Sequence, residues 1–258
     1  MRLAARPLAA MTARAASSAA LPVGGAGRLG RLDPATTGLL ICDVQEAFRS
    51  VISGFDAVCD VSGRAAAAAN AFGMPVWVTE QVPSKLGSTA AEVAVRLPRG
   101  AAVRAKSAFS MAPPLVGEFA AAPHVISFLL CGVEAHGVRG EREGGVGRPP
   151  AERLLGRPDT FASPSPVCVL QTALDLLAAG HDVHLLTDGI SSRRLADRDG
   201  GLARAAAAGA HLSTSEMAMF ELAGGAEHPA FRAISALAKE PRPHLLPGVF
   251  GGTGSAKL

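Results

Sequence analysis

The chain has 258 residues, enough for one α/β domain with a full hydrophobic core. Apolar residues make up 48% of it and charged residues 18%, a composition typical of a globular protein that argues against intrinsic disorder. The longest strongly apolar run, Val125 to Val133, has nine residues, which is too short to span a membrane and suits a buried strand.

The first 32 residues differ in composition from the rest. They are rich in alanine and serine and contain five arginines but no acidic residue, as organelle transit peptides do. Without these arginines, 20 basic and 22 acidic side chains remain, so the rest of the chain shows no charge pattern for binding nucleic acid. We expect residues 1–32 to be a mitochondrial transit peptide. A chloroplast address, or a disordered tail on a cytoplasmic protein, is the alternative.

Three glycines in this leader, Gly25, Gly27 and Gly30, match the GxGxxG pattern of dinucleotide-binding proteins. No convincing strand precedes them, and Pro34 interrupts any helix that could follow. We therefore expect no dinucleotide and no other cofactor. An oxidoreductase is the weakest functional alternative, and failure to bind NAD would remove it.

From Thr36 onward, apolar runs alternate with alanine-rich helical stretches. The expected strands are Thr37–Val44, Pro75–Thr79, Ala102–Lys106, Val125–Val133, His181–Thr187 and Ala210–Leu212. The expected helices are Val58–Ala71, Thr89–Val95, Pro114–Ala121, Val169–Ala179, Arg194–Ala208 and Thr214–Leu222. Fully apolar strands that alternate with helices predict a three-layer α/β/α domain over residues 33–250, followed by a flexible tail at 251–258.

Local signals mark several helix ends. Gly180 and Gly209 stand where two helices should end, because glycine readily adopts the left-handed conformation needed there. Ser213, with Glu216 three residues later, predicts a capping box at the start of the last expected helix.

Chemically useful side chains follow the expected strands. In parallel sheets, reacting groups gather at the carboxyl ends of the strands, and Asp43 and Lys106 each close a strand while Glu134 follows one. Cys168 precedes the apolar helical run Val169–Leu177, where the helix dipole and a nearby lysine would favour the thiolate. Taken singly, each has an ordinary interpretation: a turn-capping aspartate, a solvated lysine, a small buried residue at a helix start.

The four cysteines, Cys42, Cys59, Cys131 and Cys168, form no CxxC pair, so neither a zinc site nor a disulfide framework is indicated. Two of them lie in apolar strand-like runs, which predicts reduced, buried thiols.

The segment Gly137–Pro166 breaks the strand–helix rhythm. It contains six glycines, five prolines and five arginines, without a sustained apolar period. Thirty structureless residues are unusual inside a compact domain. We expect a disordered excursion from the domain and not a second domain.

Six stretches together resemble the isochorismatase-like cysteine hydrolase family. They are LLICDVQEAFR (39–49), MPVWVTEQVPSKLGST (74–89), RAKSAFSM (104–111), FLLCGVEAH (128–136), VCVLQTALDLLAAGHDVHLLTDGISSR (167–193) and GAHLSTSE (209–216). The final stretch AEHPAFRAISALAKE (226–240) is similar to the eukaryotic branch, which includes mitochondrial isochorismatase domain-containing proteins. The likeness runs from about Thr36 to Pro247, apart from the segment 137–166.

The resemblance implies a six-stranded parallel sheet of Rossmann-like topology with an Asp-Lys-Cys triad, here Asp43, Lys106 and Cys168. In the family the aspartate accepts the thiol proton, the lysine supports the thiolate, and backbone N–H groups near the cysteine bind the oxyanion. It also implies a cis peptide between Val133 and Glu134, and a homo-oligomer.

The chain departs from the family in two places. Where nicotinamidases carry metal-binding histidines, this chain has Glu80 to Lys85 without a histidine, so we expect no catalytic metal. Deleting Gly137–Pro166 restores the family spacing Glu134-Ala135-His136-Val167-Cys168. Because the spacing is restored to the residue, and Gly137 and Pro166-Val167 can be encoded with GT and AG at the two boundaries, we hypothesise a retained intron. The alternative is a genuine loop above the active site, which would put activity in doubt.

These observations predict a cysteine-dependent hydrolase that cleaves an amide or related C–N bond of a small molecule. The alternative is a catalytically inactive binding or scaffold protein of the same fold. Gln45 and His136 are candidates for lining the pocket, with a solvent-facing loop position as the other interpretation of His136. Nucleic-acid partners and a membrane span are not expected.

Overall fold

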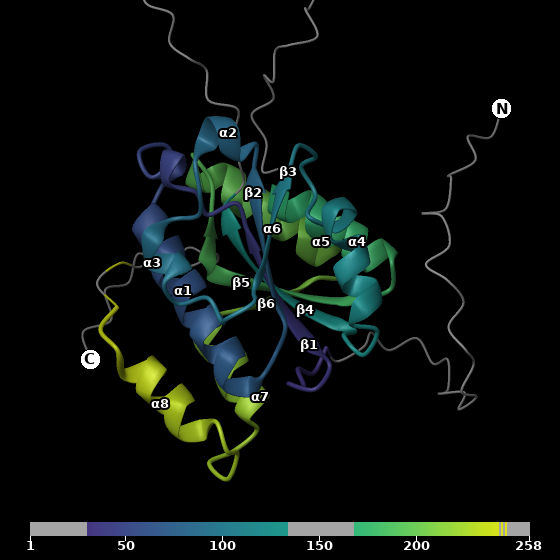
Figure 1. Cartoon of the computed structure of the whole chain (residues 1–258), viewed down its shortest axis with the longest axis vertical. Helices are drawn as coiled ribbons and strands as arrows, with labels where there is room; N and C mark the ends of the chain where they lie inside the picture. Colours follow the sequence, from purple (N-terminus) through teal and green to yellow (C-terminus); the bar gives the residue numbers. More distant parts are fainter. Residues whose placement is uncertain (1–29, 134–167, 243, 245, 247–258) are drawn as a thin grey trace, which may run out of the picture.

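The computed structural model describes residues 30–133, 168–242, 244 and 246. Six strands form one parallel sheet in the order β3-β2-β1-β4-β5-β6 (Figure 1). The strands are β1 Thr37–Cys42, β2 Val76–Gln81, β3 Ala102–Lys106, β4 Ser127–Val133, β5 Asp182–Ser191 and β6 His211–Ser213. The expected parallel sheet of six strands is therefore confirmed.

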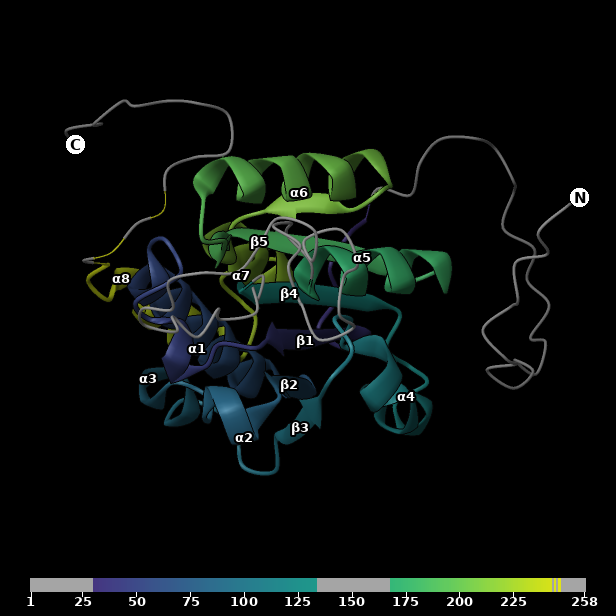
Figure 2. The ribbon, with the colours of Figure 1, turned by 90° about the horizontal axis from the view of Figure 1, so that it is seen from above.

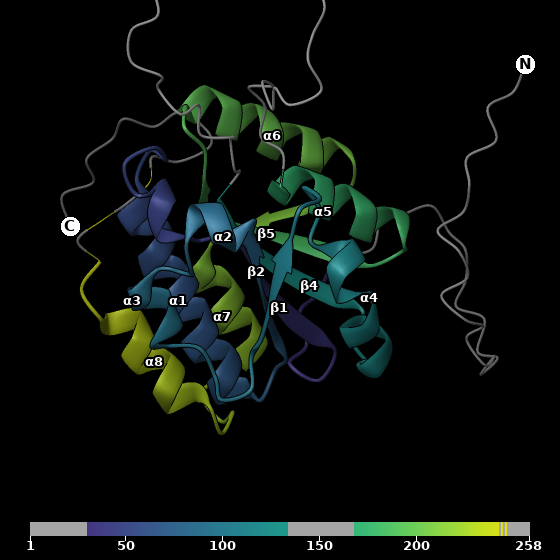
Figure 3. The same cartoon turned by 45° about the horizontal axis from the view of Figure 1, so that its top comes forward.

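Helices cover both faces of the sheet, as Figures 2 and 3 show. On one face, α1 (Phe55–Phe72) and α7 (Ser215–Ala223) contact the strands, with α3 (Ala91–Ala94) and α8 (Phe231–Lys239) packed outside them. The other face carries α4 (Ala112–Ala121), α5 (Cys168–Ala178) and α6 (Leu195–Ala207). Two short elements, the 3-10 helix η1 (Glu46–Phe48) and α2 (Pro83–Leu86), follow β1 and β2.

The central strands form the hydrophobic core. Every residue of β1 and of β4 is buried, which explains why these strands read as continuous apolar runs and not as an alternation. Side chains such as Leu40 and Leu130 are fully inaccessible, and burying each stabilises the fold by roughly 1.5–3 kcal/mol. Trp77, Phe119 and Phe128 meet in edge and tilted ring contacts where α4 covers the sheet.

Several element boundaries differ from those expected. β1 ends at Cys42, two residues early, because Asp43 has a left-handed φ of 52° that ends the extended backbone. β2 continues to Gln81 and β5 to Ser191, since their final residues still pair with the neighbouring strands. The helix expected at Thr89–Val95 is reduced to α3, and the helices α2 and α8 were not anticipated.

The expected capping box at Ser213 is wrong by one residue. Ser213 is the last residue of β6, and Thr214 caps α7 by accepting a hydrogen bond from the Met217 N–H at 3.2 Å. Gly180 and Gly209 follow α5 and α6 with positive φ values of 86° and 109°, as predicted.

Some expectations fall outside the described residues. These are the leader 1–29, the segment 137–166, the C-terminal tail, and the positions Glu134 and His136 together with the peptide bond after Val133. Within the described ranges, no helix is both long enough and apolar enough to cross a membrane.

Candidate active site

The strand order itself indicates where a site should form. In an open parallel sheet, ligands bind beyond the carboxyl ends of the strands, at the point where the strand order reverses. Here that point lies between β1 and β4. Asp43 directly follows β1, Cys168 opens α5, the next described element after β4, and Lys106 is the last residue of β3.

Lys106 connects the three predicted triad residues. Its Nζ lies 2.6 Å from Asp43 Oδ2 and 3.5 Å from Cys168 Sγ. The side chains of Asp43 and Lys106 are completely inaccessible to solvent, and so is Cys168. The structure thus brings together the three residues that the sequence singles out, in a buried cluster.

The Lys106 ammonium is enclosed by further acceptors. It donates to Gln81 Oε1 at 2.7 Å and to the carbonyl oxygens of Ala108 at 3.1 Å and Phe109 at 2.8 Å. Burial disfavours the charge, but the acidic groups of Cys42, Asp43 and Cys168 outweigh it and raise the pKa of Lys106. The lysine is therefore a fixed positive charge at neutral pH.

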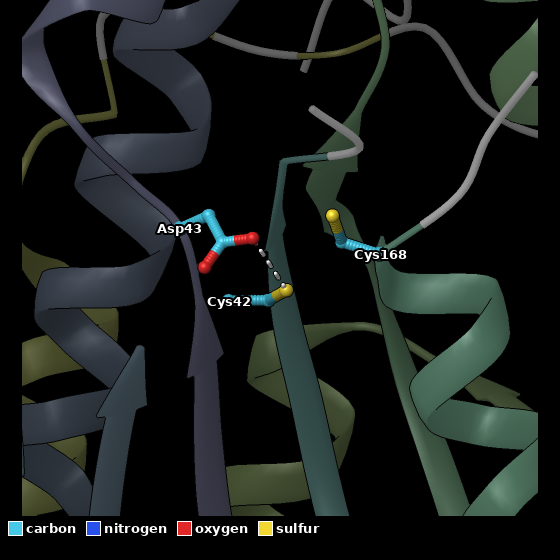
Figure 4. Close-up of side chains that lie close together, drawn as sticks. All are labelled: Cys42, Asp43 and Cys168. Atoms are coloured by element: carbon cyan, nitrogen blue, oxygen red, sulfur yellow. Dashed lines mark hydrogen bonds between the residues drawn. The ribbon is translucent and has the colours of Figure 1, made fainter. Parts of the chain in front are cut away.

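Both carboxylate oxygens of Asp43 have polar partners. Oδ1 accepts from the Thr79 hydroxyl at 2.7 Å, and Oδ2 faces Lys106 and the thiol of Cys42, whose Sγ is 3.6 Å away. The backbone N–H of Asp43 also donates to the Thr79 carbonyl at 3.1 Å. Its positive φ breaks the alternation of the strand, so the consecutive side chains of Cys42 and Asp43 lie in the same site (Figure 4).

Two supporting residues were not anticipated from the sequence. Gln81 accepts from Lys106 and donates through Nε2 to the Ser107 carbonyl at 3.0 Å. It was missed because β2 was expected to end at Thr79. Thr172 donates to the Cys168 carbonyl at 2.7 Å and accepts from the Met111 N–H at 2.9 Å, which ties the loop after β3 to the start of α5. Its position one helical turn after Cys168 is the signal that could have identified it.

Gln45, a candidate pocket residue, is buried and uses its amide within the fold. Nε2 donates to the carbonyls of Gln81 at 3.2 Å and Gly87 at 2.6 Å, and Oε1 accepts from the Gln81 N–H at 2.7 Å. It joins the segments that follow β1 and β2. Val133 lies fully buried at the end of β4.

The cluster also contains groups that can bind metals. Cys42, Asp43 and Cys168 each offer one donor atom, and these atoms lie within 4.8 Å of one another. Two thiols and a carboxylate suit a thiophilic ion such as Zn²⁺. However, the Lys106 ammonium already lies 2.6 Å from the same carboxylate, and a metal ion would have to displace it. The residues present therefore fit an ion pair better than a metal site.

A hollow of about 400 Å³ lies elsewhere in the fold and contains none of the triad residues. It is lined by Asp56, Cys59, Asp60, Glu92, Arg96 and His244. Its wall is mainly acidic, whereas the cluster around Lys106 pairs a cation with a carboxylate. The hollow is therefore separate from the candidate active site.

The chain is similar to known proteins of one family. The sequence profile of the isochorismatase domain matches residues 165–217. The human isochorismatase domain-containing protein 2 is 38% identical over 228 residues, covering 88% of this chain and 95% of that protein. The structure of MAR1 ribonuclease from Caenorhabditis elegans is similar at a TM-score of 0.66 with 33% identity, covering 80% of this chain and 91% of that one.

A more distant structure shares the fold alone. The YcaC gene product of Escherichia coli, described as an octameric hydrolase of unknown specificity, superimposes at a TM-score of 0.60 with 18% identity, covering 80% of this chain and 90% of that one. The sheet gathers Asp43, Lys106 and Cys168 at its carboxyl edge. Because the chain is also identical to the human relative at 38% of positions along nearly the whole of that protein, it belongs to the isochorismatase domain family.

Proposed function

We propose that the protein is a hydrolase that uses Cys168 as a nucleophile against an amide or related C–N bond of a small molecule. The observation that carries this proposal is the position of Lys106 Nζ, in contact with both Asp43 Oδ2 and Cys168 Sγ inside a buried cluster. Isochorismatase-fold proteins are generally hydrolases, and the substrate class is our inference from this chemistry.

In the proposed first half-reaction, the Cys168 thiol gives its proton to Asp43, and the Lys106 ammonium stabilises the thiolate. The sulfur attacks the carbonyl carbon, and backbone N–H groups near Cys168, in the first turn of α5, stabilise the oxyanion. The C–N bond then breaks, and the amine leaves with the proton held by Asp43. In the second half-reaction, Asp43 takes a proton from water as the water oxygen attacks the thioester carbon. The C–S bond breaks, the acid is released, and the proton passes from Asp43 back to the Cys168 thiolate.

A small molecule is a better candidate than RNA, although the nematode relative is named a ribonuclease. The cation of this site is surrounded by five acceptor groups of the protein and is not presented to a phosphate. RNA is nevertheless the right comparison substrate in the test.

The test is a search for an acyl-enzyme. The protein is incubated with a panel of small amides and, separately, with RNA, and intact-mass spectrometry is used to detect an acyl adduct on Cys168. We expect an adduct with at least one amide and its absence in Cys168→Ser. RNA cleavage that persists in Cys168→Ser would contradict the proposal.

The second candidate is an inactive binding or scaffold protein, and it applies if the segment Gly137–Pro166 is translated. The family profile begins at residue 165, next to the end of this segment, as expected if the segment interrupts the domain.

We propose that the segment Gly137–Pro166 is a retained intron. Sequencing of the transcript tests this: a main message that carries the corresponding ninety nucleotides would refute it. Adduct formation by a variant lacking Gly137–Pro166, but not by the full chain, would assign the loss of activity to the segment.

We further propose that residues 1–32 direct the chain to mitochondria and that the domain assembles as a homo-oligomer. A fluorescent protein fused behind residues 1–32 should accumulate in mitochondria, whereas chloroplast or diffuse cytoplasmic fluorescence would contradict this address.

For the assembly, light scattering of the purified protein should give a multiple of the 26.1 kDa chain mass, less any cleaved leader. A monomer would refute the assembly.

A further inference from the structure

Cys42 is a buried thiol for which the proposed hydrolysis has no use. Its Sγ lies 3.6 Å from Asp43 Oδ2. The sulfurs of Cys42 and Cys168 and a carboxylate oxygen of Asp43 all lie within 4.8 Å of one another. Figure 4 shows the two cysteines on different elements, at the end of β1 and at the first residue of α5.

The backbone at Cys42 is fixed by close packing of β1 against β4. Cys42 pairs with Gly132, and a Cβ at Gly132 would lie only 2.1 Å from the Cys42 carbonyl oxygen. A disulfide requires an S–S distance of about 2.05 Å. Two sulfurs within 4.8 Å therefore need to approach each other by less than about 3 Å before they can bond.

The other two cysteines do not compete for this position. Cys131 lies on β4 with its Sγ 3.5 Å from the hydroxyl of Ser62, a residue of α1 on the opposite face of the sheet from α5. Cys59 is itself a residue of α1. In the described part of the chain, Cys42 is thus the thiol positioned to react with Cys168.

We propose that Cys42 is the resolving thiol of a reversible disulfide with Cys168, formed when a peroxide oxidises the active-site sulfur, and that this bond switches the site off. The inference rests on the proposed function, because it takes Cys168 to be the reactive thiolate. It adds a modification site and a form of regulation to that function.

The chemistry balances in two steps. The Cys168 thiolate, whose proton has passed to Asp43, attacks one oxygen of hydrogen peroxide. The O–O bond breaks, and the departing hydroxide takes the proton from Asp43 and leaves as water, so that Cys168 becomes a sulfenic acid. Cys42 then gives its proton to Asp43 and attacks the Cys168 sulfur. The S–S bond forms, the S–O bond breaks, and the hydroxide leaves as water with the proton from Asp43. The pair of thiols loses two electrons, and peroxide is reduced to two waters. A dithiol reductant reverses the change by thiol–disulfide exchange.

The environment of Cys42 suits this order of events. Burial, the neighbouring Cys168 and the Asp43 carboxylate raise the pKa of Cys42 well above its ordinary value. At rest, Cys42 is therefore a protonated and unreactive thiol, and the oxidant reacts first at Cys168.

The experiment uses the full chain, reduced and kept in EDTA to exclude metal ions. The protein is treated with a small molar excess of hydrogen peroxide, blocked with iodoacetamide and digested without reductant. We expect a cross-linked peptide that contains Cys42 and Cys168 and that disappears on treatment with dithiothreitol. In Cys42→Ala the cross-link is lost, and Cys168 is found instead as a dimedone-trapped sulfenic acid and as the sulfinic acid. Cys131→Ala, which removes a buried thiol from the neighbouring strand, serves as the control and should cross-link like the wild type.

Absence of the cross-link in the wild type, with sulfinic acid accumulating at the same rate in wild type and Cys42→Ala, would overturn the inference. The rate of Cys168 alkylation in the untreated protein separates this result from failure of the proposed function. Fast alkylation at neutral pH without the cross-link rejects the disulfide alone. Slow alkylation without the cross-link rejects both the disulfide and the hydrolase.

Discussion

Asp43 Oδ2 and Lys106 Nζ lie 2.6 Å apart, and neither side chain has any surface exposed to solvent. Removing one member of such a pair leaves an uncompensated charge in the interior, whereas removing both can be almost neutral. The pair therefore makes the stability of the domain sensitive to single changes at its own site.

Lys106→Met should destabilise the folded state by about 3–5 kcal/mol, because Asp43 is left buried without its counter-charge. Urea unfolding at neutral pH measures this loss. The exposed Lys85 on α2 offers a matched control, and Lys85→Met should change the free energy of unfolding by less than about 0.5 kcal/mol. The double variant Asp43→Asn, Lys106→Met should regain part of the loss. Equal stability of Lys106→Met and wild type would show that the pair is not buried as described.

Gly132→Ala should destabilise the domain by at least about 3 kcal/mol, because the new Cβ would lie 2.1 Å from the Cys42 carbonyl oxygen on a backbone with φ of 130°. Gly117 in α4 has open space around its missing side chain, and Gly117→Ala should instead stabilise by about 0.5–1 kcal/mol. Thermal unfolding of the two variants measures both effects. A Gly132→Ala protein as stable as wild type would contradict the close contact between β1 and β4.

Thr172→Val keeps the shape of the side chain but removes the hydroxyl that joins Met111 to Cys168. It should cost about 1–3 kcal/mol, because the Met111 N–H is left without its partner in the interior. It should also slow alkylation of Cys168, since the loop after β3 loses its tie to α5. Thr187→Val, which removes a single bond to the Ser213 carbonyl, should leave the alkylation rate unchanged. If both variants alkylate at the wild-type rate, Thr172 has no positioning role.

His184 should make the domain less stable as the pH falls. It is 3% exposed, stacks on His211 at a ring distance of 4.7 Å, and its Nε2 has no hydrogen-bond partner among the described residues. Burial and the neighbouring His211 lower its pKa from 6.5 to about 4. Because the unfolded chain binds this proton more readily, the stabilisation is complete above pH 6.5. It is lost progressively down to pH 4, by at most about 3 kcal/mol.

Unfolding free energies of wild type and His184→Gln between pH 7 and pH 4 test this dependence. The variant should show a flatter profile, whereas His124→Gln, a change at an exposed histidine, should follow the wild type. Parallel profiles for wild type and His184→Gln would exclude the buried imidazole as the cause.

The sequence predicts the parallel sheet well because β1 and β4 are buried along their whole length and appear as unbroken apolar runs. The ends of helices and strands were less predictable where the backbone or a capping residue departs from the apolar pattern. Asp43 adopts a left-handed φ just after β1, and no local signal distinguishes it from the extended residues before it. The cap at Thr214 was displaced by one residue because Ser213 is an equally good capping residue, and only the pairing of β6 decides between them.

The position of the candidate site was predictable, but its internal contacts were not. Strand ends and the family resemblance identify Asp43, Lys106 and Cys168 individually. Gln81 and two carbonyl groups enclose Lys106. Gln81 reaches it only because β2 extends far enough for Gln81 to pair with Lys106 at the end of β3. Cys42 lies close to Cys168 because of the way α5 packs on β4. The apolar periodicity of a single helix or strand does not predict how two elements pack on each other.

Activation of Cys168 by Lys106 and Asp43 can be measured as the rate of Cys168 alkylation at neutral pH in the wild type and in Lys106→Met. We expect fast alkylation in the wild type and a markedly slower rate in Lys106→Met, assayed at a temperature at which the variant is folded, because the variant lacks the ammonium that stabilises the thiolate. A wild-type rate no faster than that of a cysteine in a short unstructured peptide, and unchanged in Lys106→Met, would leave the inactive binding protein as the better description.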